Sequence, residues 1–473
     1  MREARSDSRP LNAGTSRLGL SAVSLGTLGQ ADSSVNIAFP AITAWFQLDI
    51  AAIQWLVIAY LLPMSSFVLA FGKLGDLYGH RRIFMIGTVL SLVAHTLSGL
   101  APSYDWLLYL RMFQGIGFGM ILGSGPALAT FFVHEDQRSH ALAMYTMVFG
   151  AGMALGPAIG GLLVDQWGWQ TVFWYRAPLA AITLALLVAA PEPLQAVRQP
   201  KLDIVGALLL AASLGSLLLI LNALQQTSID WAFVMALLLV FGGSSTGFVR
   251  QEIRAPEPII RLSVFRDVDI ALLQASSIMI NFAGFAVLLL FPFYLAMETD
   301  LSLSVAGLVL ATSPLGTAIA GLMGTRLALT ISLKRLTSLG PYLTAFGLLA
   351  IGLLASHSTI VVMVIPMFLI GVGLGLFQFA FTDRIVVAMP SGDRGVAGSL
   401  FMVTRLLGTV AGASCMSSLL NALMTSGPGD ETGRAAMSFV AAFQITFVLV
   451  GSALIASHLV MSVFRRILHA VDA

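Results

Sequence analysis

Segments of about 20 mostly apolar residues recur along the whole 473-residue chain. A helix of that length spans the hydrocarbon core of a bilayer, since each residue adds about 1.5 Å. We place these segments at about 18–40, 52–71, 83–101, 106–132, 140–164, 170–190, 204–224, 231–249, 270–296, 303–329, 336–355, 359–382, 395–424 and 437–463. The pattern predicts an all-α polytopic membrane protein with about 14 transmembrane helices.

The composition agrees with a protein that is embedded in lipid. The chain is 57% hydrophobic and 10% charged, whereas soluble domains average about 25% charged residues. The net charge is only +2 and the basic residues are spread over short loops, so a nucleic acid is not an expected partner. No loop is long enough for a catalytic domain, and Cys415 is the single cysteine. We therefore expect neither an enzyme nor a resident metal or cofactor.

Lysine and arginine indicate which loops face the cytoplasm, because cytoplasmic loops carry an excess of both. With the amino terminus inside, 21 of the 25 basic residues fall in inner segments, three lie within spans and one, Arg434, falls in an outer loop. A missed span would move every later loop to the other side of the membrane and destroy this excess of basic residues in the inner segments. The distribution therefore predicts an even number of spans. We expect a multi-pass protein of the cell (plasma or inner) membrane with both termini in the cytoplasm.

The longest central connection divides the chain into two halves. Residues 250–269 contain Pro256, Pro258 and alternating charges, which is typical of a linker, and could form a short interfacial helix at Ile259–Phe265. The expected division is a cytoplasmic arm, a six-helix bundle, two inserted helices, the linker, a second six-helix bundle and a tail, at 1–17, 18–190, 204–249, 250–269, 270–464 and 465–473. Transporters are often built from such repeated halves.

The first apolar segment carries Asp32, the only acid that we find well inside such a segment. A carboxylate at membrane depth costs at least about 2.5–3.5 kcal/mol, so it usually faces a wet cavity or a partner. In a continuous helix Asp32 and Asn36 would share one face, and Pro40 would close the helix at its far end. Asp32 is either a proton-coupling or cation-binding group, or a helix–helix anchor held by an arginine.

The loop at 72–82 is the most specific motif in the chain. Its glycines allow two helix ends to approach closely, its acid can reach an arginine or a helix N-terminus, and its basic pair suits anionic headgroups. These residues are Gly72, Gly75, Asp76, Gly79, Arg81 and Arg82.

This loop resembles the signature of the major facilitator superfamily, and the whole chain resembles that superfamily's fourteen-helix drug:proton antiporters. Four further stretches carry the resemblance: Asn36-Ile-Ala-Phe-Pro40, Gln54-Trp55 through Tyr60, Arg111-Met-Phe-Gln-Gly-Ile-Gly117 and Gly152 through Gly156-Pro-Ala-Ile-Gly-Gly161. The helix pair at about 204–249 distinguishes these antiporters from their twelve-helix relatives.

The resemblance implies two six-helix bundles that rock around a central cavity, driven by the proton gradient and without a cofactor. Residues of the 72–82 loop would gate the cavity, together with Gly156, Pro157, Gly160 and Gly161 of the fifth span. The glycines of that span and its proline permit close packing and a local bend.

Two positions depart from the family pattern. The family's commonest first-helix acid stands five residues before the Asn, where this chain has Ala31, and Asp32 is one residue later. The sixth span has Arg176 two residues before Pro178, where the family commonly has Asn. We expect a structural role for Arg176, either bonded to backbone carbonyls or snorkelling outward, because that helix is peripheral in the resembled fold.

The fourth span supplies a partner for the buried acid. Arg111 and Asp32 lie at matching depths, and in the resembled fold the first and fourth helices both line the cavity. We therefore predict a membrane-embedded pair of the two, with Gln114 on the same face as Arg111. A change in their separation would alter proton affinity, since an arginine favours the charged form of an acid and burial disfavours it. The alternative is a permanent salt bridge that only joins two helices.

Both halves contribute expected substrate-binding residues, which offer apolar and aromatic surface with a few polar groups. They are Asp32, Asn36, Trp55, Tyr60, Gln114, Asn281, Phe285, Gln378 and Phe381. We interpret His95 as a packing residue. Arg405 has no nearby acid in its own half, and either backbone carbonyls or a substrate anion could bind it.

We expect a secondary transporter, monomeric in the bilayer, that exports lipophilic small molecules in exchange for protons. The alternatives are a proton-coupled uptake symporter, an exporter of an anionic metabolite, and a non-transporting membrane sensor or scaffold.

Overall fold

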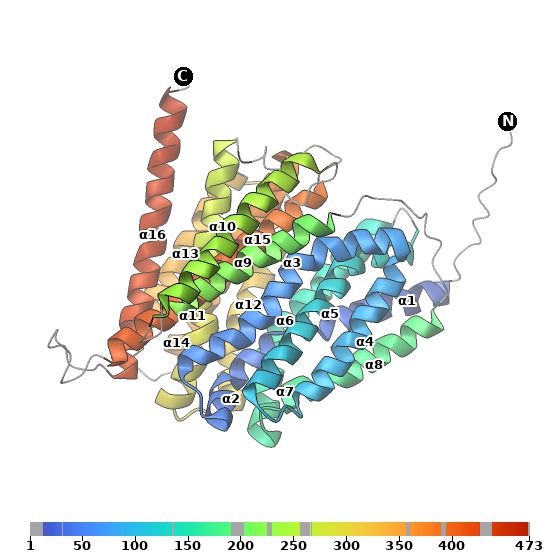
Figure 1. Cartoon of the computed structure of the whole chain (residues 1–473), viewed down its shortest axis with the longest axis horizontal. Helices are drawn as coiled ribbons and strands as arrows, with labels where there is room; N and C mark the ends of the chain where they lie inside the picture. Colours follow the sequence, from blue (N-terminus) through green and yellow to red (C-terminus); the bar gives the residue numbers. More distant parts are fainter. Residues whose placement is uncertain are drawn as a thin grey trace.

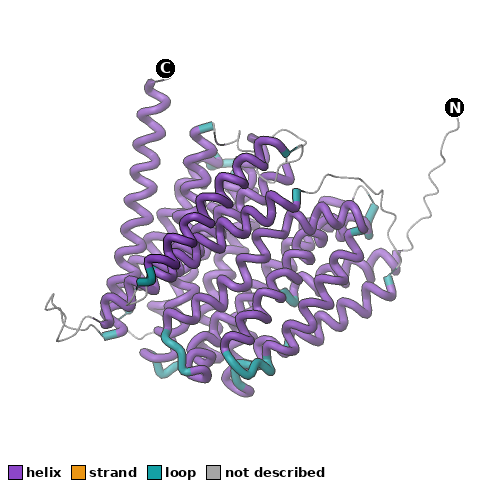
Figure 2. Tube along the Cα trace, in the orientation of Figure 1, coloured by secondary structure: helices purple, strands orange, loops and turns teal. Residues whose placement is uncertain are grey.

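The structure is a computed structural model that describes residues 13–30, 32–134, 137–190, 203–224, 229–255, 265, 267–355, 360–388, 394–425 and 438–471. Within these ranges all regular elements are helices, and none is a strand (Figures 1 and 2). The predicted all-α class is therefore confirmed. The expected interfacial helix at Ile259–Phe265 and most of the expected arm at 1–17 lie outside the described residues.

Ten helices of the described chain are long and apolar enough to cross a bilayer. An eleventh is added if α3 (Gln54–Tyr78), which bends by 51°, is taken as one span. The first span, α4 (His80–Ser98) and α9 (Ile204–Ala223) fall outside this criterion. The count of about 14 stays a prediction.

The first group of helices packs around α5 (Tyr104–Phe131) and α6 (Arg138–Trp167). Helices α3 and α4 both lie against α5, and α1 (Ala13–Leu28) lies against α6 and α8 (Arg176–Ala189). A short α7 (Thr171–Trp174) leads into α8. These contacts bring the first, fourth and sixth expected spans together, which positions the polar site described below.

The inserted pair α9 and α10 (Trp231–Arg254) packs together, and α9 also contacts α3 and α15 (Arg394–Thr425). The second group consists of α11 (Val268–Glu298), α12 (Leu303–Leu327), α13 (Leu333–Leu354), α14 (Ile360–Ala388), α15 and α16 (Phe439–Val471). In it, α14 packs against α12 and α13, and α11 packs against α15 and α16. The expected domain boundaries stay predictions.

The first span is broken, contrary to the prediction of one continuous helix over 18–40. Helix α1 ends at Leu28, a 3₁₀ helix η1 runs over Asp32–Ala38, and α2 covers Phe39–Phe46. Gly29, a poor helix former, lies at the break. Pro40 stands in the first turn of α2, where its missing N–H is not needed, so the helix starts rather than ends there.

The break also changes the direction of the polar side chains. A 3₁₀ helix has about three residues per turn, so residues four apart point about 120° away from each other. Asp32 and Asn36 therefore do not share a face, as a continuous α-helix would have required.

The two groups of helices meet tightly at one end, where α6 finishes and α12 begins. A Cβ on Gly161 would lie 3.0 Å from Gly307 Cα, and Gly307 in turn faces the backbone of Pro157. Ser304 donates a hydrogen bond to Asp165 across this junction (2.7 Å). The opposite end, where α6 begins and α12 and α14 finish, carries basic side chains such as Lys334 and Arg465; we call it the basic end.

Candidate functional site

Asp32 stands at the start of η1, directly after the break in the first span. Its side chain is only 17% exposed. Ser33 donates to the backbone carbonyl of Met153 on α6 (2.8 Å), which fixes η1 against that helix. Gly156 and Gly160 make this approach possible, because a Cβ on either would press on Ser33 or Ser34. The glycines of the fifth expected span thus position the acid.

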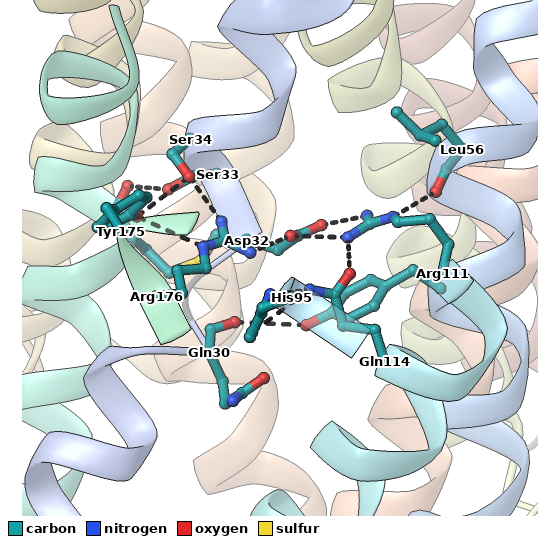
Figure 3. Close-up of polar contacts among 12 residues, drawn as sticks. Gln30, Asp32, Ser33, Ser34, Leu56, His95, Arg111, Gln114, Tyr175 and Arg176 are labelled. Carbon is teal, nitrogen blue, oxygen red and sulfur yellow. Dashed lines mark hydrogen bonds and ion pairs between the residues drawn. The ribbon is translucent and has the colours of Figure 1, made fainter. Parts of the chain in front are cut away.

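Arg111 of α5 binds both oxygens of the Asp32 carboxylate (Figure 3). Its Nη1 lies 2.9 Å from Oδ1, and its Nε donates to the backbone carbonyl of Leu56 on α3 (3.0 Å). The guanidinium is 0% exposed and lies 4.4 Å from the centre of the Tyr60 ring. The contact expected between Asp32 and Arg111 is present, and its role in proton coupling stays a prediction.

Arg176 is a second partner of the same carboxylate, which corrects the expectation of a peripheral arginine bonded to carbonyls or snorkelling. Its Nη1 donates to Asp32 Oδ1 (2.6 Å) and its Nη2 donates to the Ser34 hydroxyl (2.6 Å). Tyr175 donates to the same hydroxyl (3.1 Å). The side chain is 1% exposed, because α8 packs on α1 and turns this residue toward the break in the first span.

Gln114 and His95 extend the network away from the carboxylate. Arg111 donates to Gln114 Oε1, and the Gln114 amide donates to His95 Nδ1. Both side chains are fully buried. His95 is therefore part of a polar network. The interpretation of His95 as a packing residue was incomplete. Nothing in the spacing of α4 alone signals this, because the contact depends on how α4 packs against α5.

This arrangement sets what Asp32 can do chemically. Both of its oxygens accept hydrogen bonds from guanidinium groups, and an arginine side chain has no acceptor to offer in return. A proton on Asp32 would point at guanidinium N–H groups, which cannot accept a hydrogen bond. A proton can therefore bind Asp32 only after a guanidinium moves away. One carboxylate against two guanidinium groups also leaves one excess positive charge in the buried cluster.

A cavity of about 940 Å³ lies beside this network, between the two groups of helices. Ser33 of η1 forms part of its wall, and so do four of the expected substrate-binding residues: Asn36, Asn281, Phe285 and Gln378. Its wall also reaches Thr146, Leu322 and Asp383, near the start of α6 and the ends of α12 and α14. The cavity therefore extends toward the basic end, while the opposite end is closed by the junction of α6 and α12.

The other expected binding residues do not line this cavity. Asp32, Tyr60 and Gln114 form the buried network instead. Trp55 packs against the main hydrophobic core, and Phe381 is fully buried. An apolar or aromatic side chain satisfies a helix–helix interface as well as a cavity wall, so its type did not distinguish the two.

Two charged residues of the cavity wall were missed or left open by the sequence. Asp383 follows the segment expected to end at 382, but α14 continues to Ala388 and exposes Asp383 in the cavity. Arg405 of α15 also lines the cavity. The available signal that the helix continues was the absence of glycine and proline between Asp383 and Pro390.

The stretch 72–82, expected as a loop, is helical except at Gly79, because α3 continues to Tyr78 and α4 begins at His80. A Cβ on Gly72 would lie 3.2 Å from the carbonyl of Gly123 on α5, and Gly79 has φ of 99°, which favours glycine. Asp76 pairs with His80 (2.9 Å) rather than with an arginine or a helix N-terminus. Arg81 donates to the carbonyl of Leu187 on α8, and Arg82 is exposed.

From the sequence, the N-terminus of the helix that follows the loop at 390–395 is a further candidate partner for Asp76. That loop lies largely outside the described residues. The gating roles of the 72–82 loop and of Gly156, Pro157, Gly160 and Gly161 stay predictions. Among the described residues, no group of three or more His, Cys, Asp or Glu side chains is placed to hold a metal ion.

Comparison with known proteins identifies the architecture. The model of the Major Facilitator Superfamily matches residues 22–413. The chain is 28% identical to the multidrug resistance protein Stp of Mycobacterium tuberculosis, over 91% of this chain and 80% of that protein. It is 26% identical to the riboflavin transporter RibZ of Clostridioides difficile, over 83% and 85% respectively. The crystal structure of the POT family transporter PepTSo superposes with a TM-score of 0.70 at 14% identity, covering 97% of this chain and 98% of that one.

Proposed function

Because this chain belongs to the major facilitator superfamily, we propose that it exports lipophilic small molecules in exchange for protons by alternating access. One observation carries the proposal: a buried carboxylate that two arginines hold lies directly beside a large cavity with an apolar wall. Relatives that include a multidrug resistance protein support efflux as the direction of transport.

We assign the described conformation to the loading state of such a cycle. The positive-inside pattern assigns the basic end to the cytoplasm, and the cavity extends toward that end. A small molecule from the cytoplasm or the inner leaflet can then enter while Asp32 is ionised and held by Arg111 and Arg176. In this state both oxygens of Asp32 accept hydrogen bonds from guanidinium groups, so neither is available to a proton.

Opening of the opposite end must separate the backbones that now touch at Gly161 and Gly307. Because η1 rests on Gly156 and Gly160 of the same helix, rotation of α6 would also move Asp32 relative to Arg111 on α5. Loss of one guanidinium contact would let a proton bind from the outside. Substrate release outward and proton release inward then alternate through one carboxylate.

Uptake of a small molecule is the second candidate, and the riboflavin transporter among the relatives favours it. Uptake by symport requires the proton and the compound to move in the same direction. The proposed antiport requires opposite directions, so the sign of the proton movement separates the two.

The test uses purified protein in liposomes with an internal pH dye and an imposed proton gradient. Tetraphenylphosphonium, ethidium and pyrenebutyrate are added in turn to wild type, Asp32→Asn and the control Asp230→Asn. Asp230 is a helix N-cap at the surface, a role that asparagine also fills. We expect compound-driven proton movement, opposite in direction to the compound, in wild type and the control and none in Asp32→Asn. Absence of movement with every compound would overturn the antiport proposal.

A further inference from the structure

Arg405 lies deep in the cavity wall. It stands about 16 Å along α15 from the first residue of that helix, Arg394, at about 1.5 Å per residue. Asn281 of α11 and Thr409, one turn further along α15, line the same cavity. Both carry uncharged polar groups in the wall that contains Arg405.

Within the described chain, no hydrogen bond or ion pair joins Arg405 to another residue. This distinguishes it from Arg111 and Arg176, which both bind Asp32. Asp383 shares the cavity wall but forms no ion pair with Arg405. It lies only about 8 Å from the end of α14, which places it nearer the mouth.

An arginine at membrane depth is costly unless it is paired or faces water. Its planar group of donors matches the two oxygens of a carboxylate or the oxygens of a phosphate. The rest of the wall is largely apolar, with side chains such as Phe149, Phe285 and Met367. The cavity therefore combines one unsatisfied cation with a surface for an apolar body.

We infer that Arg405 binds an anionic group, and that the preferred substrates are amphipathic organic anions with an aromatic or aliphatic body. This inference rests on the proposed transport function and names the substrate class of that cavity. The anion binds at Arg405, with Asn281 and Thr409 within the same wall, and the apolar body occupies the space lined by Phe285 and Met367.

The cavity wall joins this site to the buried carboxylate. Ser33, the residue after Asp32, lines the same cavity as Arg405, and α15 packs against α3, whose Tyr60 ring carries the Arg111 guanidinium. An anion at Arg405 thus lies in the cavity that borders the network of Asp32. The charge of a bound anion and the charge state of Asp32 would therefore both act on Arg405, Arg111 and Arg176.

The experiment measures binding rather than transport, so its failure is distinct from a failure of antiport. Pyrenebutyrate and its uncharged amide, pyrenebutanamide, share one apolar body and differ in the carboxylate. Their affinities for the protein in nanodiscs are measured by fluorescence anisotropy for wild type, Arg405→Gln, Arg405→Lys, Asp383→Asn and the control Arg250→Gln. Arg250 is exposed on α10 and lies outside the cavity wall.

Wild type and Arg250→Gln should bind the carboxylate at least about tenfold more tightly than the amide. Arg405→Gln should remove this preference while leaving the affinity for the amide unchanged, which also shows that the cavity has kept its shape. Arg405→Lys should keep part of the preference, since an ammonium lacks the bidentate geometry. Asp383→Asn should leave the affinity for the carboxylate equal or higher.

Equal binding of the two probes by wild type would overturn the inference, and so would a preference for the carboxylate that survives in Arg405→Gln. A preference that depends on Arg405, together with absence of compound-driven proton movement in liposomes, would support the anion site and refute the antiport proposal. Compound-driven proton movement, together with equal binding of the two probes, would support the antiport proposal and refute the anion site.

Discussion

Arg111, Arg176 and Arg405 are the arginines that the sequence places inside apolar segments, and the two halves of the chain treat them differently. In the first half, Arg111 and Arg176 are 0% and 1% exposed and both bind Asp32. In the second half, Arg405 is partly exposed to the cavity and has no ion-pair partner within the described chain. Burial of a cation is tolerated where the protein supplies the anion. Where the protein supplies none, the site is left for an anion from outside.

Removal of the carboxylate that Arg111 and Arg176 share should change the stability of the protein most. Asp32→Asn leaves two buried guanidinium groups without an anion, so we expect a loss of about 3–5 kcal/mol in the free energy of unfolding. Thermal unfolding of the purified protein in detergent measures this against the control Asp230→Asn. The double variant Asp32→Asn with Arg176→Gln should recover part of the stability without recovering proton movement.

Removal of single arginines tests the contrast between the halves directly. Arg176→Gln breaks bonds to Asp32 and Ser34 but leaves Arg111 on the carboxylate, so we expect a loss of about 2–3 kcal/mol. Arg405→Gln breaks no described ion pair and should leave the unfolding temperature unchanged or raise it. Equal destabilisation by the two substitutions would show that the halves do not differ in this way.

A carboxylate placed beside Arg405 should turn this arginine, which has no ion-pair partner within the described chain, into a paired arginine like Arg111 and Arg176. Thr409 is four residues from Arg405 on α15 and lines the same cavity, so residues at the two positions are neighbours. Thr409→Asp should weaken binding of pyrenebutyrate about tenfold by competing for the guanidinium. Thr409→Asn, which has the same shape without the charge, serves as the control and should weaken binding far less.

The outer member of the network should have the smallest effect. His95→Phe keeps an aromatic ring in the same buried position and removes the acceptor for the Gln114 amide. We expect a loss of about 1 kcal/mol in unfolding free energy and little change in binding at Arg405. A loss as large as that of Arg176→Gln would mean that Gln114 and His95 carry the network rather than extend it.

The sequence predicts the fold well because the bilayer restricts the possibilities. Long apolar segments must be helices there, since backbone groups find no water. It also predicts the contact of Asp32 with Arg111, because their depths match and the family resemblance implies that the first and fourth helices both line the cavity. Arg176 could not be placed in the same way, since depth gives no information about the direction in which a side chain points around its helix.

The break in the first span was unpredictable for a related reason. Gly29 and Pro40 are each compatible with a helix boundary or a helix interior, and only the packing of η1 on Gly156 and Gly160 decides between them. The same break determines that Asp32 faces the arginines while Asn36 faces the cavity. Helical periodicity assumed over the whole segment put both on one face.

The most direct test of Asp32 as the exchanging group is a count of protons on the purified protein. A compound that drives proton movement in liposomes is added to protein in weakly buffered detergent, and the pH change is recorded for wild type, Asp32→Asn and Asp230→Asn. Binding of the compound should draw protein out of the protonated, outward-open state into the inward-open state, which holds Asp32 ionised between two guanidinium groups. Protons should therefore be released from wild type and the control, and none from Asp32→Asn. Release of the same number of protons from Asp32→Asn would show that another group carries the proton.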